Sequence, residues 1–300
     1  MNKYRLFAVV LCLLLLPAFA LTVCADIGPK PSVRVTFANM GDALCYGTLL
    51  SEYPSTGPQS VWDGNEEHIY TDGLDMAVWR AFADYEDADG YYFLQIGWQV
   101  NEAKSLAWTY YPPDRFKILL YYPETGRFVS SGVCERYAFD TYYTVDMEGV
   151  AIGEVAYDET HSTDERIEAY RSYNYRREAA ALAVRILLTI LIELGIALLF
   201  GYRERRPFLL LVAANTVTQV VLNGLLGLIR YCSGAWAFIA WYVMLELVVL
   251  LIEAVAFSLY LPKLSEKPRP RWLPAVYAVV ANSTSFAAGL FLVRWLPDVF

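Results

Sequence analysis

The sequence contains little of what metal-dependent and nucleophilic enzymes use. Among its 300 residues are two histidines, His68 and His161, and five cysteines, none of them in a CxxC or Cys/His arrangement. It also lacks a glycine-rich phosphate-binding loop, which argues against ATP use within this chain. Acidic residues outnumber basic ones, giving a formal net charge of −8, which argues against a nucleic-acid partner. We therefore expect no metal, no other cofactor and no enzymatic activity.

Apolar residues dominate instead, and charge is spread unevenly. Hydrophobic residues make up 56% of the chain and charged residues 19%. Residues 26–178 contain 26 acidic and 12 basic residues, whereas residues 179–300 contain 6 acidic and 10 basic ones. The two parts suit different solvents, so we expect an α+β chain with a mainly β domain at residues 26–160, a connector at 161–178 and a membrane domain at 179–300.

Residues 1–25 are typical of a secretory signal peptide. Lys3 and Arg5 precede a long apolar run, and two small-residue cleavage sequences follow it. Cys24 would be acylated in a lipoprotein, but the bulky residue before it disfavours that interpretation. Whether or not the segment is removed, it places residue 26 outside the cytoplasm.

From residue 32 onward, short runs rich in Val, Tyr, Phe and Thr alternate with clusters of Gly, Pro and Asp, which is typical of strands joined by turns. Residues 123–126, Pro-Glu-Thr-Gly, favour a hairpin between two of these runs. Residues 75–84 have apolar side chains at helical spacing, which predicts one helix covering the sheet. The expected strands are residues 33–37, 43–50, 91–99, 106–110, 116–122, 127–131 and 137–145.

Three features of this β domain bear on chemistry. Residues 87–90, Asp-Ala-Asp-Gly, resemble part of a calcium-binding loop, but a first carboxylate and a closing Glu are missing, so an acidic turn is favoured. Residues 66–68, Glu-Glu-His, lack a partner histidine and are interpreted as a solvated loop. Cys45 and Cys134 form either a disulfide, which an exported domain permits, or two buried free thiols.

Aromatic residues are dense in the β domain and come as adjacent pairs, for example at residues 91–92, 121–122 and 142–143. Adjacent residues of a strand face opposite ways, so both faces of the sheet would be aromatic. One face must be the core. The other either packs against the helix or is an exposed surface for a peptide, a glycan or a protein partner.

Residues 161–178 are expected to form an amphipathic helix that leads to the membrane. Ser162 and Glu165 have the spacing of a capping box, and tyrosines and arginines alternate after them. The tyrosines of this connector would lie at the level of the lipid headgroups.

Four apolar segments follow, each close to the roughly 20 residues needed to cross a bilayer. The turns at residues 201–206 and 262–271 contain seven basic residues, against one, Arg230, in the opposite turn. The positive-inside rule therefore places these two turns in the cytoplasm, and the β domain and the C-terminus outside. The segments span residues 179–200, 207–228, 236–261 and 272–292.

A polar pattern occurs twice in these segments. Leu-Ile-Glu, ending at Glu193 and at Glu253, precedes each basic turn, and Ala-Asn with following hydroxyl residues comes after it, at Asn215 and Asn282. At about 1.5 Å per residue, all four residues lie roughly 11–15 Å from the cytoplasmic end and form one layer. Because a charge facing lipid is costly, we expect them to point inward. The predicted intramembrane polar core comprises Glu193, Asn215, Thr218, Gln219, Glu246, Glu253, Asn282 and Ser285.

Two hairpins of the same orientation would form a parallel repeat, related by an axis along the membrane normal. Their polar residues have three interpretations. They form hydrogen bonds that hold the helices together, they line a path for an ion, proton or small solute, or they carry out chemistry within the membrane. The third is the weakest, because the segments contain no histidine and no Ser/His pair.

Residues 26–33 (Asp-Ile-Gly-Pro-Lys-Pro-Ser-Val), residues 110–121 (Tyr-Tyr-Pro-Pro-Asp-Arg-Phe-Lys-Ile-Leu-Leu-Tyr) and the two Glu/Asn hairpins resemble an uncharacterised family of bacterial integral membrane proteins. The resemblance covers nearly the whole chain. It implies the two-part layout and a location in the bacterial cytoplasmic membrane, and it supplies no activity, cofactor or site residue.

The sequence thus predicts a multi-pass protein of the lipid bilayer. Its exported β domain would bind or sense a ligand or partner. Its four-helix bundle would anchor the chain, associate with another membrane protein or a second copy, or relay a change of state. The first alternative is a small carrier of an ion, proton or solute that uses Glu193, Glu246 and Glu253. The second is an intramembrane protease.

Overall fold

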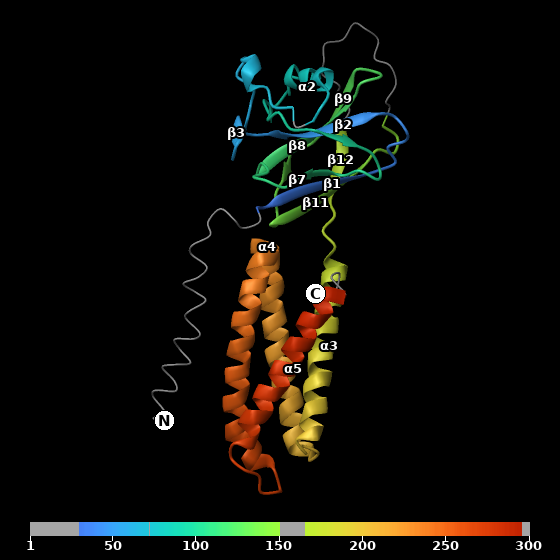
Figure 1. The fold of residues 1–300 in the computed structure, drawn as a ribbon. Coiled ribbons are helices and arrows are strands. Elements are labelled where there is room, and N and C mark those ends of the chain that lie inside the picture. The colour runs from blue at the N-terminus through green and yellow to red at the C-terminus, as the bar shows by residue number, and fades with distance from the viewer. Residues whose placement is uncertain (1–29, 72, 151–165, 296–300) are drawn as a thin grey trace. The chain divides into compact units, whose positions relative to one another are not determined.

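The computed structural model describes residues 30–71, 73–150 and 166–295, and the chain divides into two compact units. The β unit comprises Lys30–Tyr173, and the helical unit comprises the described residues from Asn174 onward. The expected signal peptide and the expected capping box of the connector lie outside the described residues. A mainly β part followed by long helices confirms the α+β class (Figure 1).

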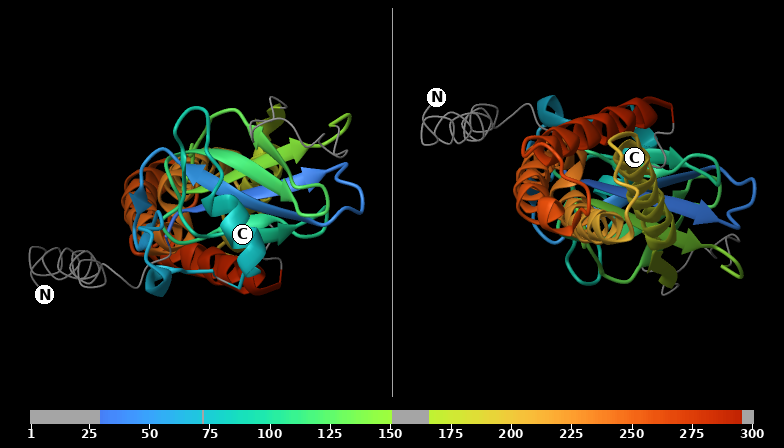
Figure 2. Two further views of the ribbon diagram at one scale, coloured as in Figure 1. Left: turned by 90° about the horizontal axis from the view of Figure 1, so that it is seen from above. Right: turned by 90° about the horizontal axis from the view of Figure 1, so that it is seen from below.

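Short strands build the β unit. In the described residues they are β1 (Ser32–Ala38), β2 (Cys45–Ser51), β3 (Ser55–Thr56), β4 (Gln59–Ser60), β5 (Tyr92–Phe93), β6 (Trp98–Val100), β7 (Leu106–Trp108), β8 (Arg115–Tyr122), β9 (Arg127–Ser131), β10 (Cys134–Glu135), β11 (Asp140–Asp146) and β12 (Arg166–Arg171). Ten of them form one sheet with the path β5-β2-β8-β9-β12-β11-β1-β7, while β6 pairs with β2 and β10 with β8. The sheet curves into a half-barrel (Figure 2). Within it, β1 with β11 and β9 with β12 are parallel pairs.

Strand β1 shows why alternation predicts these strands. Val33, Val35 and Phe37 are buried in the main core, and the residues between them are exposed. The predicted hairpin is confirmed as well, since β8 and β9 are antiparallel neighbours joined by residues 123–126. The main core therefore lies on one face of the sheet, lined by every second residue of its strands.

The run predicted as one strand at residues 91–99 is instead two short strands, β5 and β6, separated at Gln95. Gln95 has a left-handed backbone conformation with a φ of 64°, which a regular strand does not permit. Its buried side chain holds the bend: Oε1 accepts a hydrogen bond from Tyr70 N (3.0 Å), and Nε2 donates to Ser60 O (3.1 Å). The single-strand prediction is wrong because apolar patterning does not report these distant partners.

Helix α2 (Met76–Ala83) confirms the predicted helix at residues 75–84. Asp75 begins it as an N-cap whose side chain accepts a hydrogen bond from Ala77 N. Its buried face, which includes Trp79, packs against strands β2, β8 and β9 on the side of the sheet opposite to the main core. Both faces of these three strands are therefore covered.

This double covering explains the adjacent aromatic pairs of β8. Tyr121 lies on the α2 side, where its ring stacks on Phe128 with 4.6 Å between centroids. Tyr122 lies in the main core and is 1% exposed. Packing thus accounts for this pair, whereas Tyr110 and Tyr111 remain exposed.

The predicted connector helix at residues 161–178 is wrong over part of its described length. Strand β12 occupies that part, antiparallel to β11 and parallel to β9. Ile167 is buried and Ala169 packs on the main core, while the residues between and around them are exposed, which is the period-2 alternation of a strand. The next helix begins only at Tyr175, so the β unit extends past its predicted end.

Three long helices make up the helical unit: α3 (Tyr175–Leu199), α4 (Arg205–Leu264) and α5 (Leu273–Trp295). They contact one another pairwise (Figure 1). Helix α3 covers the first predicted apolar segment, α4 the second and third, and α5 the fourth. Two of them, α3 and α4, are long and apolar enough to cross a membrane.

Helix α4 is folded back on itself. A straight helix of 60 residues would be about 90 Å long and would hold Thr218 and Glu253 about 50 Å apart. Instead, Thr218 Oγ1 donates a hydrogen bond of 2.6 Å to Glu253 Oε1. The reversal occurs at Gly234, whose backbone angles are non-helical, with φ 81° and ψ −179°. The two halves of α4 therefore lie side by side and antiparallel (Figure 1).

Cys45 and Cys134 are free, buried thiols, so the disulfide that the sequence left open is not formed. Tyr46, next to Cys45, pairs with Tyr121 of β8. Cys134 pairs with Phe116, which lies five residues before Tyr121 on β8. Five strand residues separate these levels by about 16 Å, whereas a disulfide requires Cα atoms within about 7 Å. Burial raises the pKa of the Cys45 thiol to about 12.

Both core thiols should resist labelling in the folded protein, because burial disfavours the reactive thiolate. In a variant with Cys12, Cys24 and Cys232 replaced by serine, we expect no maleimide incorporation at pH 7 before denaturation and labelling of both thiols after it. Mass spectrometry of the intact chain measures the labels. As a control, Ser55→Cys places an exposed thiol on β3 and should react in the native state. Native labelling of either core thiol at the control's rate would contradict the prediction.

Candidate functional site

The helical unit has polar residues inside and apolar residues outside. Its surface carries large exposed side chains such as Leu199, which is 85% exposed, and Trp236, which is 66% exposed. A water-soluble protein has the opposite arrangement. Because the buried polar groups are away from the surface, their hydrogen bonds have to come from other buried side chains and from helix carbonyls, as when Asn282 Nδ2 donates to Ala278 O. These buried residues are Arg185, Glu193, Asn215, Gln219, Asn223, Glu253, Asn282 and Ser285.

Two hydroxyl groups bind the two glutamates. Thr218 donates to Glu253 (2.6 Å), and Ser285 donates to Glu193 (3.0 Å). Each hydroxyl stands three residues after the asparagine of its own sequence copy. Each glutamate is therefore bound by the equivalent hydroxyl of the other copy, so the contact is reciprocal between the two pairs of helical segments.

The second hydrogen bond to the glutamates is not reciprocal. Asn282 Nδ2 donates to Glu253 Oε2 at 2.7 Å. The equivalent asparagine, Asn215, is fully buried and lies beside the Tyr277 hydroxyl, but it donates no hydrogen bond to either glutamate. Glu193 Oε2 is unpartnered within the described part of the chain. One glutamate therefore has both oxygens bound, and the other has only one.

Gln219 and Asn223 form a separate amide pair on α4. Asn223 Nδ2 donates to Gln219 Oε1 at 3.1 Å, and Gln219 Nε2 finds no hydrogen-bond partner in the described residues. Glu246, on the second half of α4, has one carboxyl oxygen, Oε2, without a hydrogen-bond partner among the described residues. The hydrogen bonds thus do not join the eight predicted residues into one cluster: they connect Glu193 with Ser285, and Glu253 with Thr218 and Asn282.

A cavity of about 270 Å³ lies within the helical unit and is lined by α3, α4 and α5. Ser285 lines it and also binds Glu193, so the cavity reaches the glutamate layer. The wall therefore combines donors and acceptors with an apolar surface. Its polar lining residues include Arg185, Thr189, Gln219, Asn223, Arg230, Glu246 and Ser285, and its apolar ones include Leu188, Phe238, Ile239 and Val243.

Arg185 is the cavity residue that the sequence reasoning missed. It is 8% exposed, and its guanidinium lies 5.6 Å from the centroid of the Phe238 ring. Its Nε and Nη1 atoms have no hydrogen-bond partner among the described residues. The signal for Arg185 is the same as for Glu193, a charge within a long apolar run. It has no counterpart in the second sequence copy, so a search for the repeated pattern does not find it.

Arg269 joins the two basic turns at the end of α3. Its Nη1 donates to Phe200 O (2.9 Å) and its Nη2 to Gly201 O (2.6 Å). These carbonyls lie at the C-terminus of α3, where a helix leaves its last acceptors without internal partners. The guanidinium also lies 4.5 Å from the centroid of the Tyr202 ring. Arg269 thereby acts as a cap supplied by a distant segment.

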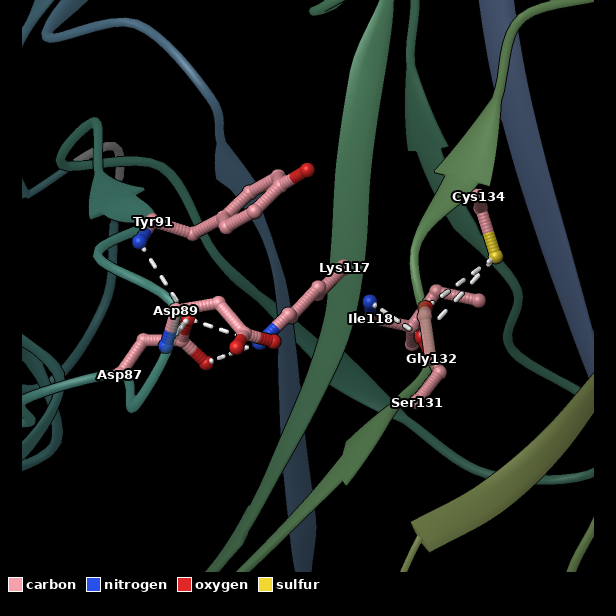
Figure 3. Close-up of polar contacts among 8 residues, drawn as sticks. All are labelled: Asp87, Asp89, Tyr91, Lys117, Ile118, Ser131, Gly132 and Cys134. Atoms are coloured by element: carbon pink, nitrogen blue, oxygen red, sulfur yellow. Dashed lines mark hydrogen bonds and ion pairs between the residues drawn. The ribbon is translucent and has the colours of Figure 1, made fainter.

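In the β unit, the acidic loop after α2 binds a lysine. Asp87 and Asp89 contact the Lys117 ammonium at 2.8 and 2.6 Å (Figure 3). Asp87 Oδ2 also accepts hydrogen bonds from the backbone N of Asp89 and of Tyr91. Among the described residues no group of three or more metal-ligating side chains occurs. The carboxylates that resembled a calcium loop are thus partners of a cation from β8.

The ion pair is complete at neutral pH. Burial disfavours the charged Lys117 ammonium, but its hydrogen bonds to Asp87 and Asp89 outweigh this effect and raise its pKa. The hydrogen bond from Lys117 lowers the pKa of Asp89. Neutral pH lies between these two values, so both groups are charged.

The remaining candidates of the β unit lie at its surface. His68 is in an exposed 3₁₀ turn, and its Nδ1 lies 2.7 Å from Asp63 Oδ2. This agrees with the solvated loop interpreted from the sequence. A separate open hollow of about 390 Å³ has aromatic side chains in its wall, including Trp62, Tyr91 and Tyr92.

Comparison of the chain with protein-family models, with curated proteins and with solved structures finds no match.

Proposed function

We propose that this chain is a multi-pass protein of the bacterial cytoplasmic membrane. Residues 1–25 are its signal peptide, the β unit lies outside, and the helical unit is a bundle of four membrane segments made of two repeated hairpins. The β unit binds or senses a ligand or a protein partner. The bundle anchors it and relays a change of state.

The main support for this proposal is the distribution of side chains in the helical unit, with polar groups buried and apolar groups exposed. Its carboxylates, amides and buried arginine lie inside, and leucine, valine, isoleucine and tryptophan side chains cover the outside. In water such a surface drives association. In a bilayer it is the stable arrangement, because a polar group facing hydrocarbon costs several kcal/mol.

The reciprocal hydroxyl contacts support the repeat. A pseudo-two-fold axis along the membrane normal would exchange the Thr218–Glu253 contact with the Ser285–Glu193 contact. Both basic turns then face the cytoplasm, in agreement with the positive-inside rule. Arg269, which joins these turns, holds the inner ends of the two hairpins together.

The different hydrogen bonding of Asn215 and Asn282 supports a relay: Asn282 binds a glutamate and Asn215 does not. Glu253 is bound from both hairpins, by Thr218 of the first and Asn282 of the second. Movement of one hairpin along the other would therefore break one of the two hydrogen bonds at Glu253. In the second arrangement that we propose, Glu193 Oε2, which is unpartnered among the described residues, would gain a hydrogen bond from the Asn215 amide. Two discrete arrangements of one core are what a relay requires.

Cysteine accessibility in intact cells tests the topology. In a cysteine-free background, Ser60→Cys on β4 should react with a membrane-impermeant maleimide, because the β unit is outside. Lys267→Cys in the second basic turn should react only after lysis. Both positions are exposed, so burial does not confound the comparison. Equal labelling of the two variants in intact cells would overturn the proposed topology.

A second function, transport of a small solute, is favoured by the cavity that reaches Glu193 through Ser285. In a carrier whose path runs from the cavity to the glutamate layer, combining Glu193→Gln with Glu253→Gln should abolish solute flux in reconstituted vesicles. Flux that is unchanged in this variant would exclude the carrier. Flux that depends on the glutamates would replace the anchor and relay as the main role.

A further inference from the structure

The cavity of the helical unit contains a cation whose pairing is incomplete. Arg185 is more than nine-tenths buried, and two of its nitrogens have no hydrogen-bond partner in the described residues. Glu178, the acidic residue near the start of α3, is paired with Arg230 instead, at 3.8 Å. A buried guanidinium that lacks hydrogen bonds at two nitrogens and shares its nearest carboxylate with a second arginine is unfavourable. An anionic ligand would relieve this cost, and the planar guanidinium fork fits a carboxylate or phosphate.

A second polar end lies deeper in the same cavity. Among the described residues, the amide nitrogen of Gln219 and one carboxyl oxygen of Glu246 have no hydrogen-bond partner, and both residues line the cavity. Glu246 stands eight residues beyond Phe238, over whose ring the Arg185 guanidinium lies, which is about 12 Å along α4. The two polar ends are therefore separated by the length of a short chain.

The wall between these ends is apolar. Leu188, Ile239 and Val243 line it. The cavity volume of about 270 Å³ is near the lower limit of pockets that enclose organic ligands, which are about 300–1,000 Å³. Its occupant must therefore be small and carry polar groups at both ends.

We propose that this cavity binds a small amphipathic anion. Its carboxylate or phosphate group lies on Arg185, its apolar body lies along Leu188 and Val243, and a neutral hydrogen-bonding group meets Gln219 and Glu246. The site goes beyond anchoring and relaying, and it does not require transport. A soluble organic acid and the head group of an anionic lipid share this chemistry.

Thermal unfolding of the full-length protein in neutral detergent tests the site with two probes, 6-hydroxyhexanoate and phosphatidylglycerol. At least one should raise the unfolding midpoint in a concentration-dependent way. Arg185→Gln should weaken that probe's apparent Kd about tenfold or more, because it removes a charge-assisted hydrogen bond. Arg206→Gln, at an exposed arginine at the start of α4, should leave it unchanged.

The two probes also distinguish a soluble organic acid from a lipid head group as the ligand. Stabilisation by 6-hydroxyhexanoate assigns a soluble acid, and stabilisation by phosphatidylglycerol alone assigns a lipid head group. Stabilisation that persists in Arg185→Gln, or the absence of stabilisation by either probe, overturns the proposal. Without a probe, Arg185→Gln should unfold at the same or a higher temperature than the native protein, since it removes an incompletely paired buried charge. A lower midpoint would mean that Arg185 has a structural role instead.

The end of the cavity at Gln219 and Glu246 is tested by comparing 6-hydroxyhexanoate with hexanoate in the native protein and in Glu246→Leu. If only lipid binds, the same Glu246→Leu variant is compared with the native protein for phosphatidylglycerol binding. Native protein should bind 6-hydroxyhexanoate several-fold more tightly than hexanoate, because the hydroxyl reaches Gln219 and Glu246. Glu246→Leu should abolish this preference while leaving hexanoate binding unchanged, or weaken phosphatidylglycerol binding relative to the native protein. Equal affinity for the two acids in the native protein, or lipid binding that is insensitive to Glu246→Leu, would overturn the assignment of this end.

Discussion

Replacing Lys117 with methionine is expected to lower the free energy of unfolding of the β unit by about 3–5 kcal/mol. The substitution keeps most of the side-chain volume but leaves Asp87, whose side chain is 2% exposed, without its cation. An unpaired carboxylate in such a site is costly. Chemical denaturation of residues 30–173 should show a lower midpoint with an unchanged slope.

Two further variants separate charge from packing. Combining Lys117→Met with Asp87→Leu should recover most of the loss, because no unpaired buried charge remains. Asp89→Asn should cost much less than Lys117→Met, because the Asp89 side chain is 55% exposed and its ion pair is screened by solvent. A double variant as unstable as Lys117→Met alone would contradict the electrostatic explanation.

The pH dependence supplies an independent check. In the native protein the pKa of Lys117 is raised and that of Asp89 is lowered. The lysine's contribution to stability is complete below its unfolded-state pKa and is lost as the pH rises through the raised value. The aspartate's contribution is present above its unfolded-state pKa and is lost as the pH falls through the lowered value. In Lys117→Met both contributions are absent, so the deficit of this variant should shrink as the pH falls through the lowered pKa of Asp89 in the native protein.

Replacing Gly234 with alanine is expected to disrupt the reversal of α4. Its backbone angles, φ 81° and ψ −179°, belong to a region that is essentially restricted to glycine, and a side chain there costs about 1–3 kcal/mol. Because Thr218 meets Glu253 only when α4 folds back, the polar core should loosen as well. A disulfide engineered between Leu222→Cys and Val249→Cys, which belong to one buried cluster, reports the reversal. We expect it to form less completely in Gly234→Ala.

Two other glycines of α4 are matched controls. Gly224 and Gly227 are helical, and a Cβ at either position would meet open space. Alanine there should be neutral or stabilising by up to about 1 kcal/mol, because it reduces the entropy lost on helix formation. If the disulfide forms equally well in Gly234→Ala and in these controls, the reversal does not depend on the backbone freedom of glycine.

The strands could be predicted where burial alternates along the chain. Strand β1 was expected at residues 33–37 and occupies Ser32–Ala38. The bend at Gln95 could not be predicted, because the partners of its amide lie 25 and 35 residues away. Strand β12 was missed for a related reason: its arginines and tyrosines also fit an amphipathic helix, and its pairing with β9 and β11 decides between the two.

In the helical unit the sequence limits which residues share a layer but not which ones touch. Depth follows from the rise of a helix, so the positions of Glu193 and Glu253 along their helices can be counted. Contact depends on how each helix is rotated about its axis, so the exchange of hydroxyl donors between the two copies is visible only in the packed structure. Arg185 differs from both, because only the cavity shows that it has room for a ligand.

The hydrogen bond between Ser285 and Glu193 spans 92 residues, and Arg269 caps carbonyls 68 and 69 residues before it. The ribosome makes the chain from its N-terminus, so α3 emerges long before either partner exists. In the membrane topology proposed above, a newly inserted α3 has an unbound carboxyl in its apolar interior and an uncapped end. Stable insertion of the first segment therefore awaits synthesis of the last, and a nascent chain stopped before residue 269 should remain with the insertion machinery.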